Sequence, residues 1–340
     1  MRQRPLARLK RPIDMIKSDD FVAGREALSR EASAWLRRLT SGAATGADLA
    51  ALDLWREKSP KHDRAFAEAA LLWEVAGDAA AMAVAENPGL AAMPDGRMLG
   101  RRGFMFGGFA LAASVAAVGV VRPPLGLWPS LSEMKADFRT GRGEQRRIDV
   151  PGQVSLQLNT LTSVDVPPVA GAGTLIDLLA GEAAVVTEGY LSEVVVRAGA
   201  VRAGTVRGSF NVRKDGAAVC VTCLDGEVRV RTAQGSAVLS AGRQVAYEES
   251  GLTPVATADS QVVAAWREGL LVFREVPLIR LIEEVNRYRP GKIVLLDQRL
   301  AQRPVVATFR LDRIDDVVTF VHQVMNVPTR VLPGRIVLLG

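Results

Sequence analysis

The spacing of hydrophobic and polar residues divides most of the chain into three regions. Across residues 25–90 apolar residues recur at helical spacing, and capping and stop signals separate the segments. Across residues 138–250 hydrophobic and polar residues alternate, with glycine-rich breaks about every ten residues. Residues 260–340 contain two copies of a strand, helix, strand pattern. The pattern predicts a small all-α N-terminal bundle, an all-β sandwich or roll, and a small α+β domain of repeated βαβ units.

The segment 103–121, GFMFGGFALAASVAAVGVV, differs from all three regions because it contains no charged residue, amide or proline. A bilayer core about 30 Å thick is crossed by about 20 helical residues, which is close to the length of this segment. A core helix of a soluble domain normally keeps a polar stripe, and this segment has none. The sequence therefore predicts a multi-domain membrane protein with a single transmembrane helix, joined to its neighbours by a linker at 91–102 and a juxtamembrane connector at 122–137.

Two properties of this segment are left open by the sequence. Its flanks carry equal numbers of nearby basic residues, so the positive-inside rule does not decide the orientation. Gly103 and Gly107 have the spacing of glycines that pack transmembrane helices together, but glycine is also common in such helices generally. The spacing alone does not distinguish helix association from a helix that crosses the membrane by itself.

The apolar residues of the helical region include three tryptophans, Trp35, Trp55 and Trp73, together with Leu36 and Phe66. Large aromatic residues dominate the cores of small bundles, so one interpretation places these side chains inside. A bundle of this size, however, buries little apolar surface of its own and is often completed by another protein. These five residues are therefore candidates either for the core or for a surface that binds a partner.

The net charge of +6 is spread along the chain, apart from a basic segment at its start. Residues 1–24 are expected to form a disordered basic arm, in which Met1 and Met15 are alternative start residues. A protein that binds nucleic acid directly concentrates its basic residues on one surface. The charge pattern therefore predicts no direct contact with nucleic acid.

The sequence contains no assembled catalytic, cofactor or metal motif. Cys220 and Cys223 lie three positions apart on a predicted strand and so on opposite faces, which disfavours a disulfide between them. Their Cys-x-x-Cys spacing is also found in redox sites, but no helix begins after it. The two histidines, His62 and His322, are expected on opposite sides of the membrane. We predict a protein that is not an enzyme and has no cofactor or metal; a lone serine or threonine nucleophile is the enzymatic alternative.

Several short motifs resemble the FecR family in their order along the chain. FRTGRGEQRRIDVPGQVSLQLNTLTSVDV, residues 138–166, resembles the start of the FecR-type periplasmic domain, and LLAGEA, GSFNVR, LDGEVRV and LSAGRQVAY continue it between residues 178 and 247. WLRRL, LDLWREKSPKHDRAF and LLW resemble the helical N-terminal domain of that family, and WREGLLVF and VNRY resemble its C-terminal domain. The resemblance covers residues 25–340.

This resemblance implies a regulator of transcription in the cell envelope. FecR-like proteins are inner-membrane regulators, or anti-sigma factors, whose cytoplasmic helices, here 25–90, bind an extracytoplasmic-function sigma factor. The periplasmic C-terminal domain, here 260–340, then receives a signal from the signalling domain of a TonB-dependent outer-membrane receptor and so controls genes of iron and siderophore uptake. The N-terminus is expected in the cytoplasm and the C-terminus in the periplasm, with envelope proteases as further partners. A passive membrane-anchored periplasmic scaffold without sigma-factor control is the alternative.

The resemblance also points to a site of self-cleavage. Some FecR-like proteins cleave themselves at a Gly-Thr bond just before the segment that corresponds to FNVR. Here Gly208 and Ser209 directly precede that segment, whereas Gly204 and Thr205 lie a few residues earlier. Attack of a hydroxyl group on the preceding carbonyl also needs a strained turn. These four residues are the candidates for cleavage, although their order departs from that of the family.

Overall fold

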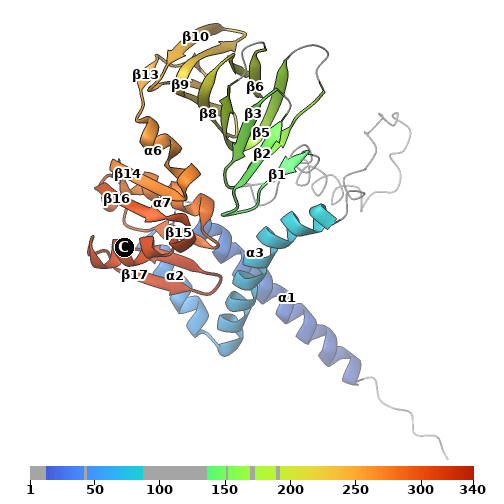
Figure 1. Cartoon of the computed structure of the whole chain (residues 1–340). Coiled ribbons are helices and arrows are strands. Elements are labelled where there is room, and N and C mark those ends of the chain that lie inside the picture. The colour runs from blue at the N-terminus through green and yellow to red at the C-terminus, as the bar shows by residue number, and fades with distance from the viewer. Residues whose placement is uncertain (1–12, 42–43, 87–135, 151, 169–172, 189–191) are drawn as a thin grey trace, which may run out of the picture.

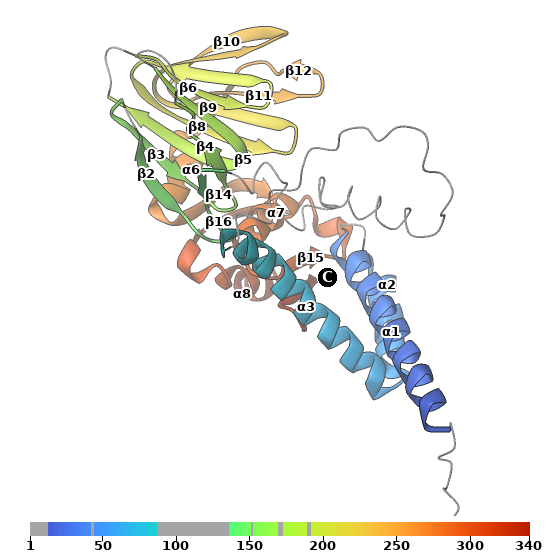
Figure 2. The ribbon, with the colours of Figure 1, turned by 90° about the vertical axis from the view of Figure 1, so that its right-hand side faces the viewer.

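The computed structural model describes residues 13–41, 44–86, 136–150, 152–168, 173–188 and 192–340 (Figure 1). These residues form a helical region, a β domain and a C-terminal α+β unit, in that order along the chain. The C-terminal unit contacts both of the others, with the β domain at one end of the molecule and the helices at the other (Figures 1 and 2).

The helical region consists of α1 (Ile13–Thr40), α2 (Gly46–Glu57) and α3 (Pro60–Glu86). α2 begins at a capping box, in which the Thr45 side chain accepts from the Asp48 amide and the Asp48 carboxylate accepts from the Thr45 amide at 2.9 Å. Pro60 occupies the first position of α3, where its missing N–H removes no helical hydrogen bond. Both helix starts agree with the sequence pattern, whereas α1 begins earlier than expected, within residues 1–24.

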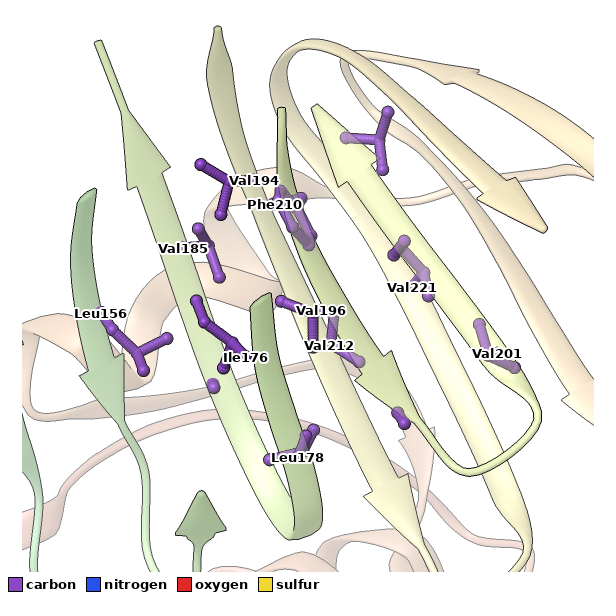
Figure 3. Packing of buried hydrophobic residues seen from close by; sticks show 14 of the residues in the cluster. Leu156, Ile176, Leu178, Val185, Val194, Val196, Val201, Phe210, Val212 and Val221 are labelled. Atoms are coloured by element: carbon purple, nitrogen blue, oxygen red, sulfur yellow. The ribbon is translucent and has the colours of Figure 1, made fainter. Parts of the chain in front are cut away.

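The β domain is a 13-stranded, mainly antiparallel sheet that encloses one apolar core. The long strands β5 and β9, of 14 and 15 residues, each pair with several neighbours and so connect the parts of the sheet. Alternate side chains point inward, among them Leu156, Ile176, Phe210 and Val221 (Figure 3). The strands are β1 (Phe138–Arg139), β2 (Arg146–Val150), β3 (Val154–Leu158), β4 (Ser163–Asp165), β5 (Thr174–Thr187), β6 (Val194–Ala198), β7 (Val201–Thr205), β8 (Gly208–Asp215), β9 (Ala218–Thr232), β10 (Gly235–Ser240), β11 (Arg243–Glu248), β12 (Gly251–Leu252) and β13 (Ala256–Thr257).

The C-terminal unit contains the strand, helix, strand order twice, but its two copies do not form separate sheets. β14 pairs with β16 in one small sheet, and β15, β18 and β17 form a second one in that order. Each predicted βαβ copy therefore contributes strands to both sheets. The elements are α6 (Ser260–Ala264), η3 (Ala265–Glu268), β14 (Leu270–Pro277), α7 (Leu278–Tyr288), β15 (Lys292–Leu295), η4 (Gln298–Leu300), β16 (Pro304–Arg310), η5 (Leu311–Arg313), α8 (Asp316–Gln323), β17 (Thr329–Leu332) and β18 (Ile336–Leu339).

In the sheet of β15, β17 and β18, the strands β15 and β18 are buried on both faces. Along β18, Val337 and Leu339 belong to the core beneath α7 and α8, whereas Ile336 and Leu338 belong to a core shared with the helical region. β15 repeats this alternation, and Val294 faces the helical region. This sheet is therefore the layer at which the helices attach.

The predicted fold class of a membrane protein with a single transmembrane helix is wrong for the residues that the structure describes. None of the helices among them combines the length and the apolar character that crossing a membrane requires. α1 and α3 reach 28 and 27 residues, but charged residues recur along both, and such residues are costly in hydrocarbon. The segment 103–121, with Gly103 and Gly107, lies outside the described residues.

Candidate functional site

The five candidate residues of the helical region lie together in one core. Leu36, Trp55 and Phe66 are buried, and Trp35 and Trp73 are half-buried and pack against them. The rest of this core includes residues of the C-terminal sheet, so the predicted separate bundle is not what forms. The physical reason is size, because three helices alone bury too little apolar surface and the sheet supplies the remainder. The buried residues of this shared core are Ala32, Leu36, Leu39, Ala44, Leu52, Trp55, Phe66, Ala69, Ala70, Val294, Leu296, Leu332, Ile336 and Leu338.

Polar contacts also join the helices to the sheet. Arg330 of β17 donates from both terminal nitrogens to the carboxylate of Asp53 on α2, at 2.5 and 2.7 Å. Lys292 of β15 donates from Nζ to the backbone oxygen of Thr40, at the end of α1, at 2.5 Å. Burial lowers the pKa of Lys292, and the nearby charge of Arg142 lowers it further. Each of these contacts links residues that are far apart in the sequence.

The turn between β17 and β18 touches α3. Gly334 has φ +72, and a Cβ atom at this position would lie 2.7 Å from the backbone oxygen of Ala70 and 3.1 Å from its Cβ. An ordinary side chain at residue 334 would therefore collide with the helix. The close approach fixes the distance between the sheet and α3.

Three leucines of the helical region are exposed and were not singled out by the sequence pattern. Leu54 on α2 and Leu71 and Leu72 on α3 have exposed fractions of 67%, 58% and 64%. They lie off the stripe of buried residues, since Leu52, Trp55, Ala69 and Ala70 face the core. An apolar residue on the polar side of an amphipathic helix was the signal that could have identified them.

The contact between the β domain and the C-terminal unit is polar and centres on Glu182 of β5, which is 5% exposed. Its carboxylate accepts hydrogen bonds from Asn159 at 2.9 Å, from Asn211 at 2.9 Å and from Arg287 of α7 at 3.1 Å. Asn159 also donates to the hydroxyl oxygen of Tyr288 at 2.6 Å. Two amides and one guanidinium thus satisfy a buried carboxylate from both sides of the contact.

The polar contact continues around this centre. Arg287 also binds Glu284 at 2.6 Å, and Glu284 binds Arg213 of β8 at 2.6 Å. Burial raises the pKa of Tyr288, and the carboxylates of Glu182 and Glu284 raise it further. The tyrosine is therefore neutral at physiological pH and acts here as a hydrogen-bonding group.

A cavity of about 260 Å³ lies beside this network. Its wall includes Glu182, Asn211 and Arg213 from the β domain and Trp266 and Tyr288 from the C-terminal unit. Within the described part of the chain, Asn211 Oδ1 and Trp266 Nε1 are buried and have no hydrogen-bond partner. The lining of the cavity is therefore partly polar and partly apolar. The cavity separates the two units over part of their contact.

The cysteines and histidines occupy structural positions. Cys220 and Cys223 are free thiols, and burial raises the pKa of both, that of Cys223 to about 11. A thiol with a raised pKa stays protonated and is a poor nucleophile, which does not favour redox chemistry. His62 packs edge-on against Trp55 at 5.0 Å, whereas His322 lies in the C-terminal unit with Nδ1 3.2 Å from Val327 O.

The candidate cleavage residues lie in regular strands. Gly204 and Thr205 belong to β7, where Gly204 pairs with both β6 and β9. The hydroxyl of Thr205 lies 2.7 Å from the oxygen of Glu227 and is held there as a donor. At the second pair, Gly208 has φ +136 and would place a Cβ atom 2.4 Å from Asp225 O, and Ser209 follows it in β8. The structure brings no basic side chain to either hydroxyl among the contacts of the described residues.

Together these observations define a three-part chain in which a helical region and a β domain both attach to a C-terminal α+β unit. The matches to known families fall on the first two parts. Residues 136–229 match the FecR protein family, and residues 30–72 match a domain of unknown function, DUF4880. The resemblance to the FecR family is thereby confirmed for residues 136–229, which lie in the β domain.

Solved structures show the same fold over part of the chain. A protein from Parabacteroides distasonis, proposed to be an anti-sigma factor, has a crystal structure that is 20% identical in sequence, with a TM-score of 0.53 over 60% of this chain and 97% of that one. A second crystal structure, also of a proposed anti-sigma factor from that organism, gives 21% identity and a TM-score of 0.52 over 59% and 96% of the two chains. No curated protein matches the sequence. Identities this low establish likeness of fold alone.

Proposed function

We propose that this chain regulates transcription by binding a sigma factor, and that it acts as an anti-sigma factor. The observation that carries the proposal is the pairing, in one chain, of a FecR domain at residues 136–229 with a DUF4880 region at residues 30–72. The fold likeness to proteins proposed to be anti-sigma factors supports it. The finer proposal is that the partner is an extracytoplasmic-function sigma factor.

The helical region is the part proposed to bind the sigma factor. Its exposed leucines, Leu54, Leu71 and Leu72, offer apolar surface that the rest of the described chain leaves uncovered. Large exposed apolar side chains on helices are typical of surfaces that receive a partner helix. We propose that these leucines make the first contact with the sigma factor.

The C-terminal unit is the part proposed to receive the signal. Among the described residues β14 and β16 pair only with each other, so each has an edge that no described strand covers. Val306 on β16 and Val331 on β17 are 67% and 68% exposed. Free edges with exposed valines accept an added strand, and we propose the signalling domain of a TonB-dependent receptor as the chain that adds it. Control of iron and siderophore uptake genes belongs to this finer proposal.

Binding to the sigma factor is tested with two exposed positions. The full chain carrying Leu71→Asp and Leu72→Asp is titrated against an extracytoplasmic-function sigma factor from the same genome. If the leucines anchor the complex, affinity falls about 30-fold or more, which corresponds to about 2 kcal/mol. Val306→Asp, at a similarly exposed valine of the C-terminal unit, is the matched control and keeps full affinity.

The result also separates the proposal from its alternative. A passive scaffold binds no sigma factor, so wild-type chain without measurable affinity would contradict the whole proposal. Wild-type binding that both leucine substitutions leave intact would contradict only the proposed surface. The expected location and the role of envelope proteases stay predictions.

A further inference from the structure

The cavity between the β domain and the C-terminal unit is large enough for a small molecule. Its volume is about 260 Å³. An apolar cavity of about 150 Å³ holds a molecule of the size of benzene, so this one has room for a ring that carries a small polar group. Its lining includes half-buried residues, among them Cys220 and Val263, so the cavity is open to solvent on part of its surface. A molecule of this size can therefore enter it from outside.

Two residues of the cavity wall have a buried polar atom that no described residue satisfies. Nδ2 of Asn211 donates to Glu182 at 2.9 Å, which leaves the acceptor Oδ1 of the same amide without a partner. Nε1 of Trp266, a donor, has no partner among the described residues either. Asn211 lies on β8 and Trp266 on η3, so the two atoms come from the two sides of the contact. A buried polar atom without a hydrogen bond costs free energy, and a molecule held between these two residues removes that cost.

The charged groups at the cavity already neutralise one another. Glu182 binds Arg287 at 3.1 Å. Glu284 binds the same guanidinium group at 2.6 Å and that of Arg213 at 2.6 Å. Two carboxylates and two guanidinium groups carry no net charge, so a charged ligand would give up its hydration without an opposite charge to replace it. The wall therefore favours a neutral ligand.

One side of the cavity is apolar and belongs to the C-terminal unit. It consists of Val262, Val263, Leu270, Leu271, Val272 and Phe273. A matching ligand is apolar over much of its surface and has a polar group that both donates and accepts a hydrogen bond. A carboxamide does so with two separate atoms, because its N–H donates and its carbonyl oxygen accepts.

We propose that this cavity binds a small neutral molecule in which a carboxamide is attached to an apolar group. The amide N–H donates to Oδ1 of Asn211, and the carbonyl oxygen accepts from Nε1 of Trp266. The apolar group lies against Leu271 and Phe273 of β14. Because the two hydrogen-bond partners belong to different units, the bound molecule bridges the β domain and the C-terminal unit. The inference concerns these two units alone and does not depend on the binding of a sigma factor.

The first experiment compares three probes of nearly equal shape, titrated against the full chain by ligand-observed NMR. Benzamide carries the carboxamide, acetophenone has a methyl group in place of the amide nitrogen, and benzoate is charged. Benzamide is expected to bind with a dissociation constant of about 1 mM, which is typical of a ligand this small. Acetophenone leaves Oδ1 of Asn211 unpaired and benzoate brings an unpaired charge, so each is expected to bind about tenfold more weakly. A cavity that holds only water binds none of the probes, and that result or equal affinities of all three would overturn the proposal.

The proposed donor is tested by a substitution that keeps an aromatic ring. Trp266→Phe removes Nε1 and is expected to weaken benzamide binding about 2- to 10-fold, as for the loss of one hydrogen bond. Trp73→Phe, in the helical region, is the matched control and keeps full affinity. Equal benzamide affinity of the two variants would overturn the bridge between the units.

A substitution that fills the cavity tests the place of binding. Val263→Phe adds an aromatic ring to the lining and is expected to weaken benzamide binding about tenfold by taking up its space. Val195→Phe is the matched control, because Val195 is also a half-buried valine but lies on β6 and does not line the cavity. It is expected to keep full affinity. A folded Val263→Phe chain that binds benzamide as well as Val195→Phe does would overturn the proposed site.

Thiol labelling tests the same place without a larger side chain in the wall. Cys223→Ala leaves Cys220 as the one thiol of the chain, and Cys220 lines the cavity. Benzamide at ten times its dissociation constant is expected to slow the reaction of Cys220 with a small thiol reagent about tenfold. Benzoate at the same concentration is the control and is expected to slow it about twofold or less. Equal labelling rates with and without benzamide would overturn the proposal, whether or not Val263→Phe folds.

Discussion

The C-terminal unit holds its two neighbours by contacts of opposite character. The helical region attaches through an apolar core with a few ion pairs at its margin, whereas the β domain attaches through a buried carboxylate and its hydrogen-bond partners. Apolar contacts are tolerant of small shifts because they have no fixed direction, but a buried charge has to keep its partners in place. The comparison indicates that the polar contact fixes orientation, while the apolar contact is the one that tolerates small shifts.

The largest expected effect comes from removing the centre of the polar contact. Glu182→Ala leaves the guanidinium of Arg287 and the amides of Asn159 and Asn211 without their shared partner in a buried setting. The free energy of unfolding is expected to fall by about 3–5 kcal/mol, as when one member of a buried ion pair is removed. Denaturant unfolding of the full chain measures the loss.

A surface carboxylate of the C-terminal unit provides the reference for this change. Glu283→Ala removes the exposed partner of Arg280 and is expected to change stability by less than about 0.5 kcal/mol. If Glu182→Ala were as mild as Glu283→Ala, the polar contact would not fix the orientation of the β domain.

The next effect concerns the apolar contact. Leu36→Ala removes a side chain that is 1% exposed in the core between the helices and the sheet. The expected loss is about 2–5 kcal/mol, and amide exchange should rise in the helical region and not in the β domain. Equal exchange in both regions would show that the two contacts open together and that the contrast between them is wrong.

The smallest effect tests a single group of the polar contact. Tyr288→Phe removes the oxygen that accepts from Asn159 and is expected to cost about 0.5–1.5 kcal/mol near neutral pH. Because the pKa of Tyr288 is raised above its ordinary value of 10.0, the folded chain favours the neutral phenol. Stability from this group is complete below pH 10.0 and is lost as the pH rises above it, since the unfolded tyrosine then ionises first.

The pH dependence of stability tests the same group as the substitution Tyr288→Phe. Unfolding measured from pH 9 to pH 11 should show a fall in wild-type stability that is reduced in Tyr288→Phe. A wild-type slope in Tyr288→Phe would mean that another group causes the loss at high pH.

The local sequence was sufficient to predict the helices and strands and much of their order along the chain. Residues 138–250 alternate because each strand exposes one face and buries the other, and that pattern acts over a few residues. The capping box at Thr45 and the proline at the start of α3 likewise act within one helical turn. The sequence also contains a signal for the shared core. The continuous apolar runs at 293–296 and 336–339 are typical of strands buried on both faces.

Only the tertiary structure decided which elements meet. Asn159, Glu182, Asn211 and Arg287 lie on separate elements, and nothing in their local sequence indicates that they share hydrogen bonds. The sheet packs against one side of the helices, and this is why Trp55 is buried and Leu71 is exposed. Periodicity is set by forces within an element, whereas burial and partners depend on contacts between residues that the sequence keeps far apart.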